Sequence, residues 1–134
     1  MIKLFRLLVT LAYAGVLFYL FSFPFPETPP LFRHADKVFH FGLYFPMGFL
    51  AVWTLRLTRF RYSPRLLWIA FIATLLYGLF TELNQMLIPE RDADLLDLCA
   101  NIIGGFLGVS FAAWLIRQMK HEHFSWSLRK RNSC

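Results

Sequence analysis

The sequence predicts an all-α integral membrane protein, a four-transmembrane-helix bundle with short loops, and three observations support this. Hydrophobic residues make up 57% of the 134 residues and charged residues only 16%, too few charges to cover a soluble domain of this size. Four apolar runs approach the roughly 20 residues that a helix needs to cross a bilayer. The basic residues lie between these runs, which indicates membrane topology and not a nucleic-acid footprint. We therefore predict one membrane domain over residues 1–134 and no nucleic-acid partner.

The first predicted helix covers residues 7–23 and follows Lys3 and Arg6. A basic start before an apolar stretch is also typical of a signal peptide. The residues after the run, Ser22-Phe23-Pro24, contain no small-x-small cleavage pattern. We predict a retained transmembrane helix, with a cleaved signal peptide as the alternative.

The other three helices are predicted at residues 38–55, 66–88 and 98–116, and a basic tail follows at residues 117–134. Pro46 lies inside the second run, where neighbouring helices can satisfy the carbonyl that it frees, so we expect a kink. The last third of the third run is unusually polar.

Three of the seven glycines have an informative spacing. Gly78 lies one turn before Glu82 and is expected to let a neighbouring backbone come close. Gly104 and Gly108 form a small-xxx-small pair in the fourth run. We expect this pair to pack inside the bundle, with a dimer interface as the alternative.

The charges predict the orientation. Short loops rich in Lys and Arg stay in the cytoplasm, and eleven of the 14 basic residues fall on one side of the predicted helices. Both termini are therefore expected in the cytoplasm, and the loops around residues 24–37 and 89–97 outside it. Seven of the eight acidic residues gather on that outward side: Glu27, Asp36, Glu82, Glu90, Asp92, Asp94 and Asp97.

Polar side chains follow one stripe on each of the last three helices, at similar depths on the outward side. Residues four apart share a helix face, and such groups are costly in hydrocarbon unless they face one another. We predict an outward-facing pocket that contains Asp36, His40, Glu82, Gln85, Asp97 and Asn101, with Lys37 and Arg91 at its rim. The alternative is that these groups only hold helices together by hydrogen bonds, and that Lys37 and Arg91 neutralise nearby carboxylates.

The motifs and their order resemble the VanZ-like family of small membrane proteins. They are Asp36-Lys37-x-x-His40-Phe41 with Tyr44, then Gly78-x-x-x-Glu82-x-x-Gln85, then Pro89-Glu90-Arg91, then Asp94-x-x-Asp97-x-x-x-Asn101-x-x-Gly104 with Gly108. The resemblance covers about residues 34–108 and leaves out the first helix and the tail. It implies a bacterial cytoplasmic-membrane protein near the cell envelope, linked by the family's name to resistance to the glycopeptide teicoplanin, and it supplies no settled activity.

Two main functions compete. In the first, the pocket acts on a lipid-linked or cell-envelope substrate, with His40 as acid or base, Asp36 orienting its ring and Glu82 as a second acid or base. Lys37, Gln85, Arg91, Asp97 and Asn101 would then bind the substrate. In the second, the same residues bind a ligand or partner without chemistry. Transport is disfavoured because the polar stripes stop at the outer half of the helices.

The sequence assigns no cofactor, no metal and no oligomeric state. A divalent cation on Asp36, His40, Glu82 or Asp97 is an alternative, but the ligand set is mixed and unspecific. The only partner that composition itself predicts is the lipid bilayer.

Overall fold

The computed structural model describes residues 1–22, 34–56, 63–88 and 94–131, and side chains as far as residue 119. It contains four helices: α1 (Ile2–Ser22), α2 (Ala35–Leu55), α3 (Pro64–Gln85) and α4 (Leu95–Arg131). No strand occurs in the part of the chain that is described. All four helices are long and apolar enough to cross a membrane, which confirms the predicted helix count and all-α class.

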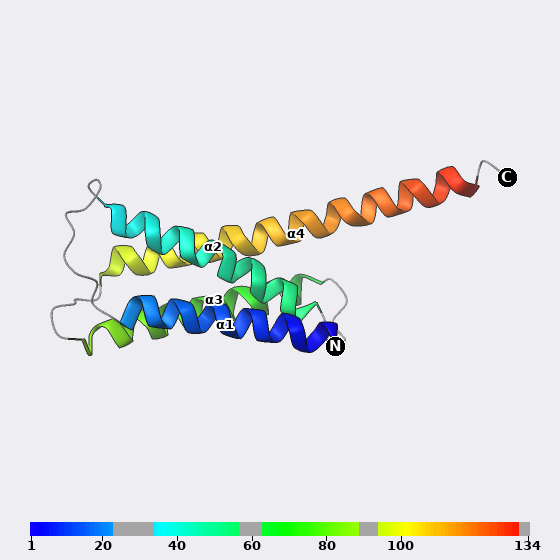
Figure 1. Cartoon of the computed structure of the whole chain (residues 1–134). Coiled ribbons are helices and arrows are strands. Elements are labelled where there is room, and N and C mark those ends of the chain that lie inside the picture. The colour runs from blue at the N-terminus through cyan, green and yellow to red at the C-terminus, as the bar shows by residue number, and fades with distance from the viewer. Residues whose placement is uncertain (23–33, 57–62, 89–93, 132–134) are drawn as a thin grey trace.

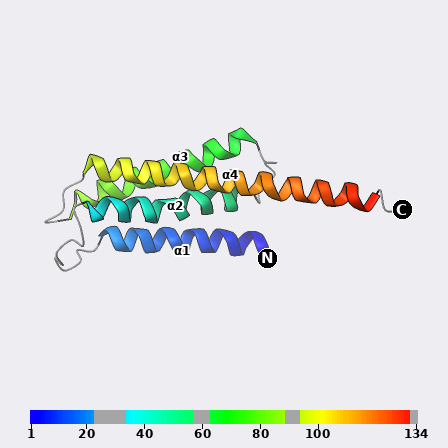
Figure 2. The ribbon, with the colours of Figure 1, turned by 90° about the horizontal axis from the view of Figure 1, so that it is seen from above.

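The helices lie side by side, and the ribbon has two distinct ends (Figure 1). The first turns of α2 and α4 and the last turn of α3 lie together at one end, which we call the polar end. The N-terminus lies at the opposite end, together with the last turn of α2 and the first turn of α3. In both views α4 extends past the other three helices at this opposite end (Figure 2).

Helix α4 is much longer than predicted. The apolar run suggested an end at residue 116 and a separate tail, whereas the helix continues to Arg131. The sequence contains no Gly or Pro between Val109 and Arg131, so no residue in that stretch opposes helix continuation. Over the residues whose side chains are described, the stretch apolar enough to cross a membrane is Leu95–Met119, and the helix continues beyond it.

Helix α3 is bounded by clear local signals. Ser63 accepts a hydrogen bond from the Leu66 amide at 3.4 Å, and Pro64 occupies the first turn, where its missing N–H is not needed. The helix ends at Gln85, earlier than predicted, and the chain turns through Ile88. Pro89 follows and disfavours helical geometry in the residue before it.

Helices α2 and α4 pack against each other through glycines. A Cβ at Gly104 would collide with the Phe41 carbonyl oxygen, and one at Gly108 would collide with the Phe45 carbonyl oxygen. A Cβ at Gly48 would likewise collide with the Gly105 carbonyl oxygen. The small-xxx-small pair is therefore used inside the chain, as expected, and the α2–α4 seam depends on the absence of side chains.

Gly78 does not act as predicted. A Cβ there would meet the side chains of Tyr44, at 3.3 Å, and Asn101, at 3.4 Å, and not a neighbouring backbone. The glycine instead leaves room for those two side chains beside α3. The backbone approach that we expected here occurs in α4, because its glycines face α2 directly.

Helix α1 is held to α2 and α3 by hydrogen bonds along its length. Tyr77 donates to the Ala14 carbonyl at 2.5 Å, and Tyr13 donates to the Leu43 carbonyl at 2.7 Å. Further bonds join Thr10 to Thr54 at 2.7 Å, Asn84 to Ser22 at 2.8 Å and Arg6 to the Trp53 carbonyl at 3.4 Å. The first apolar run is thus an integral part of the four-helix fold.

Candidate functional site

Three buried polar side chains meet near the polar end, one from each of α2, α3 and α4. We call His40, Glu82 and Asn101 the buried trio. Asn101 Nδ2 donates to Glu82 Oε1 at 2.9 Å, and His40 Nδ1 lies 3.1 Å from Asn101 Oδ1 and 3.4 Å from Glu82 Oε1. Each side chain is at most 7% exposed as a residue, so its polar atoms need partners inside the protein.

The depth of the trio follows from helix geometry. At a rise of 1.5 Å per residue, His40 lies about 8 Å into α2, Asn101 about 9 Å into α4, and Glu82 about 5 Å before the end of α3. The three helices therefore bring these residues to similar depths, as their separate stripes predicted. Ionisable side chains at such positions are stabilised only when they face partners inside the protein.

A second cluster lies next to the trio, toward the helix ends. We call Lys37 with Asp36, Asp94 and Asp97 the lysine cluster. Lys37 Nζ donates to Asp36 Oδ2 at 2.8 Å, Asp94 Oδ2 at 2.7 Å and Asp97 Oδ1 at 3.0 Å. An ammonium group has three N–H donors, so the three carboxylates account for all of them.

Asp97 connects the two clusters. Its Oδ1 accepts from Lys37, and its Oδ2 lies 3.8 Å from His40 Nε2. The residue is nearly buried, whereas Asp36 and Asp94 are more exposed to the surroundings. The two clusters thus form one continuous polar path, from the exposed lysine cluster to the trio.

The hydrogen bonds of the trio determine which ring nitrogen of His40 carries a proton. Because Asn101 donates its amide NH₂ to Glu82, its carbonyl oxygen faces His40. An amide oxygen only accepts, so His40 Nδ1 must carry the hydrogen and donate it. Nε2 is then the ring nitrogen that faces Asp97 and the lysine cluster.

Aromatic side chains complete the site. Phe21 of α1 stacks on the His40 ring, with 4.5 Å between centroids. Next to it, the Tyr44 hydroxyl lies 2.5 Å from Thr81 Oγ1, and Thr81 donates to the Gly78 carbonyl at 2.9 Å. The trio is therefore covered by an apolar ring on the α1 side and bounded by a satisfied hydroxyl pair.

The structure brings together most of the residues that the sequence selected. His40, Glu82 and Asn101 are in mutual contact, and Asp97 lies beside His40. Gln85 is buried on α3, and Lys37 and Asp36 lie at the exposed edge. Arg91 lies outside the described residues. His40 Nε2 lies 3.8 Å from Asp97 Oδ2, while Asp36 pairs with Lys37.

Sequence reasoning did not include Phe21 or Thr81 in the site. Phe21 is one of 16 phenylalanines in the chain and lies in the helix that shows no polar stripe, so nothing in its sequence context distinguished it. Thr81 directly precedes Glu82, and its hydroxyl was a readable signal beside the polar stripe of α3.

The lysine cluster also resembles a cation site. One carboxylate oxygen from each of Asp36, Asp94 and Asp97 lies within 4.8 Å of the others. The Lys37 ammonium already lies among these oxygens and supplies the positive charge that a metal ion would bring. The geometry therefore gives no support for a metal at the lysine cluster.

Asp94 lies just before α4, outside the membrane-spanning segments. The Lys37 ammonium hydrogen-bonded to it lowers the pKa of the Asp94 carboxyl below its ordinary value, and the Leu96 amide acts in the same direction. The Leu96 amide donates to Asp94 Oδ1 at 2.8 Å. Asp94 thus caps the start of α4 as well as pairing with Lys37.

Four apolar helices with a polar cluster enclosed between three of them define a multi-pass membrane protein. Comparison with known families then identifies the family: the protein-family model described as VanZ/LLP1 matches residues 7–117. The chain belongs to the VanZ/LLP1 family. The match includes most of α1, which the resemblance at residues 34–108 had left out, and extends to Arg117 in α4. No curated protein and no solved structure matches the chain.

Proposed function

We propose that this protein acts on a lipid-linked or cell-envelope substrate at the outer face of the bacterial cytoplasmic membrane, through the polar end. The observation that carries the proposal is the buried contact of His40 with Asn101 and Glu82. Ionisable groups at membrane depth indicate function by default, because hydrocarbon makes them costly. Membership of the VanZ/LLP1 family supports a link to glycopeptide resistance.

In this proposal His40 is the acid or base. Asn101, itself held by Glu82, fixes the ring through Nδ1, and this leaves Nε2 to exchange a proton on the side of the lysine cluster. A base oriented through its second nitrogen is the usual arrangement for histidine in catalysis. Asn101 then takes the orienting role expected for Asp36, and Asp97, whose Oδ2 lies 3.8 Å from Nε2, would stabilise the ring when Nε2 carries a proton.

The charge balance favours one kind of substrate group. Three carboxylates surround one ammonium in the lysine cluster, which leaves two negative charges when all are ionised. Lys37 is occupied by these carboxylates and is poorly placed to hold a phosphate or carboxylate. We therefore propose that the substrate presents a cationic or hydrogen-bond-donating group to this edge, and that Lys37 keeps the carboxylates together.

The second candidate is a binding or structural role without chemistry. It is favoured by the hydrogen bonding of the site: among the described residues, no buried side-chain nitrogen or oxygen lacks a partner. A network in which every polar group is hydrogen-bonded can hold three helices in register without having any catalytic role. The two candidates differ in whether His40 Nε2 must exchange a proton.

One substitution at His40, with a matched control elsewhere on α3, separates the candidates. His40→Asn retains a donor near the position of Nδ1 and removes Nε2, and a control, Asn84→Ala, removes the bond from α3 to Ser22 away from the trio. We expect His40→Asn to fold and insert but to abolish protection of cells against teicoplanin, measured as the minimum inhibitory concentration. Full protection by His40→Asn would rule out proton exchange at Nε2 and leave the structural role.

We also propose that both termini are cytoplasmic and that the polar end faces outward. Cys99 is exposed and free near the polar end, and Thr58 lies in the basic connection between α2 and α3. In a Cys134→Ser background, an impermeant maleimide applied to spheroplasts should label Cys99. The same reagent should label Thr58→Cys only after lysis, and the reverse result would overturn the orientation.

A further inference from the structure

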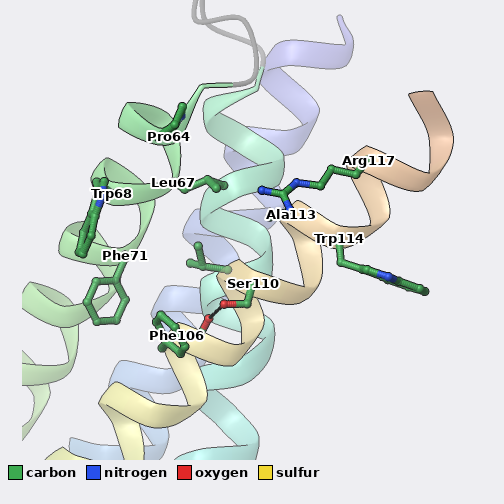
Figure 3. A pocket seen from close by; sticks show the side chains of 10 residues that line it. Pro64, Leu67, Trp68, Phe71, Phe106, Ser110, Ala113, Trp114 and Arg117 are labelled. Carbon is green, nitrogen blue, oxygen red and sulfur yellow. Dashed lines mark hydrogen bonds between the residues drawn. The ribbon is translucent and has the colours of Figure 1, made fainter. Parts of the chain in front are cut away.

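A cavity between α3 and α4 lies at the opposite end of the molecule from the polar cluster. Its volume is about 360 Å³, within the range of small-molecule sites. Aromatic side chains from both helices line it, among them Trp68 and Phe71 of α3 and Phe106 of α4 (Figure 3). It is therefore a groove between two membrane-spanning helices and not a part of the polar site.

The lining of this cavity is apolar except at two positions, Ser110 and Arg117. Ser110 donates its hydroxyl to the Phe106 carbonyl within its own helix at 2.8 Å, so this donor does not need an acceptor on a ligand. The cavity wall thus suits an alkyl chain, and a polar ligand body would lose its hydrogen bonds to water without replacement.

Arg117 supplies a positive charge at one edge of the cavity. It directly follows Ile116, the last residue of the apolar run of α4, and a basic residue at the end of such a run is expected where the bilayer meets water. Figure 3 shows its guanidinium reaching from α4 toward Leu67 of α3. A guanidinium at the boundary can bind a phosphate through two parallel hydrogen bonds.

An apolar cavity with arginine at its edge occurs a second time at this end. A cavity of about 400 Å³ is lined by apolar residues of α2 and α4, and Arg6 and Arg56 lie at it. Arg6 also lies over the Trp53 ring, with its guanidinium carbon 4.9 Å from the centroid. Apolar grooves that end in arginine are thus a repeated property of the opposite end, whereas the polar end presents carboxylates.

From these observations we infer that the α3–α4 cavity is a binding site for an anionic membrane phospholipid, with an acyl chain between Trp68 and Phe106 and the headgroup phosphate on Arg117. Basic pockets between membrane helices recognise anionic headgroups, and tryptophans at the boundary favour the interfacial region. Charge complementarity selects a phospholipid over a second apolar helix, because a helix would bring no anion to Arg117.

Fluorescence quenching by brominated lipids tests the site. In the full chain, Trp53→Phe, Trp114→Phe and Trp126→Phe leave Trp68, which is 62% exposed, as the sole tryptophan. The protein is placed in phosphatidylcholine vesicles that contain brominated phosphatidylglycerol or brominated phosphatidylcholine. We expect phosphatidylglycerol to associate near Trp68 about fivefold more strongly, the effect of one basic residue on an anionic lipid.

Two variants and one control locate the effect. Arg117→Gln should remove the preference for phosphatidylglycerol, whereas Lys3→Gln, which removes a charge that lines neither cavity, should retain it. Ser110→Phe fills the groove from an exposed position and should lower quenching of Trp68 by the anionic lipid, with helix content unchanged by circular dichroism.

Three outcomes would overturn the inference. Equal association of the two lipids would mean that the groove holds ordinary bilayer lipid without recognition. Equal losses in Arg117→Gln and Lys3→Gln would assign any preference to the general positive charge of this end. Shielding of Trp68 from both brominated lipids would mean that a second copy of the chain covers the groove.

Discussion

The two ends of the molecule use charge in opposite ways. At the polar end, carboxylates outnumber basic groups, and the side chains of the buried trio and the lysine cluster satisfy one another inside the protein. At the opposite end, Arg6, Arg56 and Arg117 lie beside apolar grooves. The first arrangement encloses polar groups between helices, and the second directs them toward the membrane boundary. Enclosed charge indicates chemistry or specific binding, whereas boundary charge indicates contact with lipid headgroups.

The α2–α4 seam joins the two ends, and its disruption should have the largest effect. Gly108→Val would drive side-chain atoms into the Phe45 carbonyl and the Phe49 amide, which are backbone groups that cannot rotate away. We expect a loss of about 3 kcal/mol of stability, the upper part of the range for overpacking, measured as the thermal transition in detergent. Gly15→Ala and Gly42→Ala have nothing within 4 Å of the new Cβ and should retain the transition; equal losses in all three would show that the seam is not tight.

The next largest effect is expected inside the polar end. Asn101→Ala removes the amide between His40 and Glu82, and with it the hydrogen bonds that this amide makes to His40 Nδ1 and to Glu82 Oε1. A buried polar group that loses its partner costs about 1–3 kcal/mol, so we expect a loss of about 2 kcal/mol in a denaturation titration. The control Ser110→Ala removes an exposed hydroxyl bonded within its own helix and should change stability little.

Helix α1 reaches from one end of the molecule to the other, and we expect a hydrogen bond that holds it to contribute less stability than the contacts of Asn101. Tyr77→Phe removes the hydroxyl that bonds the Ala14 carbonyl and keeps the ring. Hydrogen bonds between membrane helices contribute about 0.6 kcal/mol on average, so we expect a shift of that size in the thermal transition. Ser110→Ala, which removes a hydroxyl bonded to the Phe106 carbonyl within its own helix, is the comparison. A larger shift for Ser110→Ala would contradict the assigned docking contact.

The smallest effect concerns acid stability at the lysine cluster. The Asp94 carboxyl has a lowered pKa because of Lys37. Its contribution to folding stability is therefore fully present above the pKa that this carboxyl has in the unfolded chain. That contribution is lost as the pH falls through the folded-state pKa. Asp94→Asn should therefore lower stability slightly at neutral pH and flatten the decline on acidification, measured by melting temperature against pH. An unchanged pH profile would mean that the Lys37–Asp94 pair is not maintained in solution.

The number of helices and the residues of the polar stripes were readable from the sequence, because both depend on local patterns. Apolar run length fixes whether a helix can span a bilayer, and a spacing of three or four residues places His40 on one face with Asp36. Membership of the VanZ/LLP1 family confirms the resemblance that those motifs suggested. The end of α4 was missed because the apolar run ends before the helix does.

Pairing between helices could not be read in the same way. Spacing placed His40, Glu82 and Asn101 on faces of separate helices, but not which nitrogen meets which oxygen. It suggested Asp36 as the neighbour of His40, whereas helix α4 brings Asp97 to Nε2 and leaves Asp36 with Lys37. The spacing also predicted that a neighbouring backbone would come close to Gly78, whereas in the fold the close backbone contacts occur at Gly104 and Gly108.

The sequence by itself thus determined the class of protein, its four membrane-spanning helices and the residues that must avoid lipid. These follow from the cost of placing polar groups in hydrocarbon, which each residue experiences whatever its neighbours are. Only the tertiary structure decided that Lys37 is shared by three carboxylates, that Phe21 covers His40, and that Arg117 lies at an apolar groove. Those features depend on distances between helices far apart in the chain, and such distances are set by the glycine seam and the docking of α1.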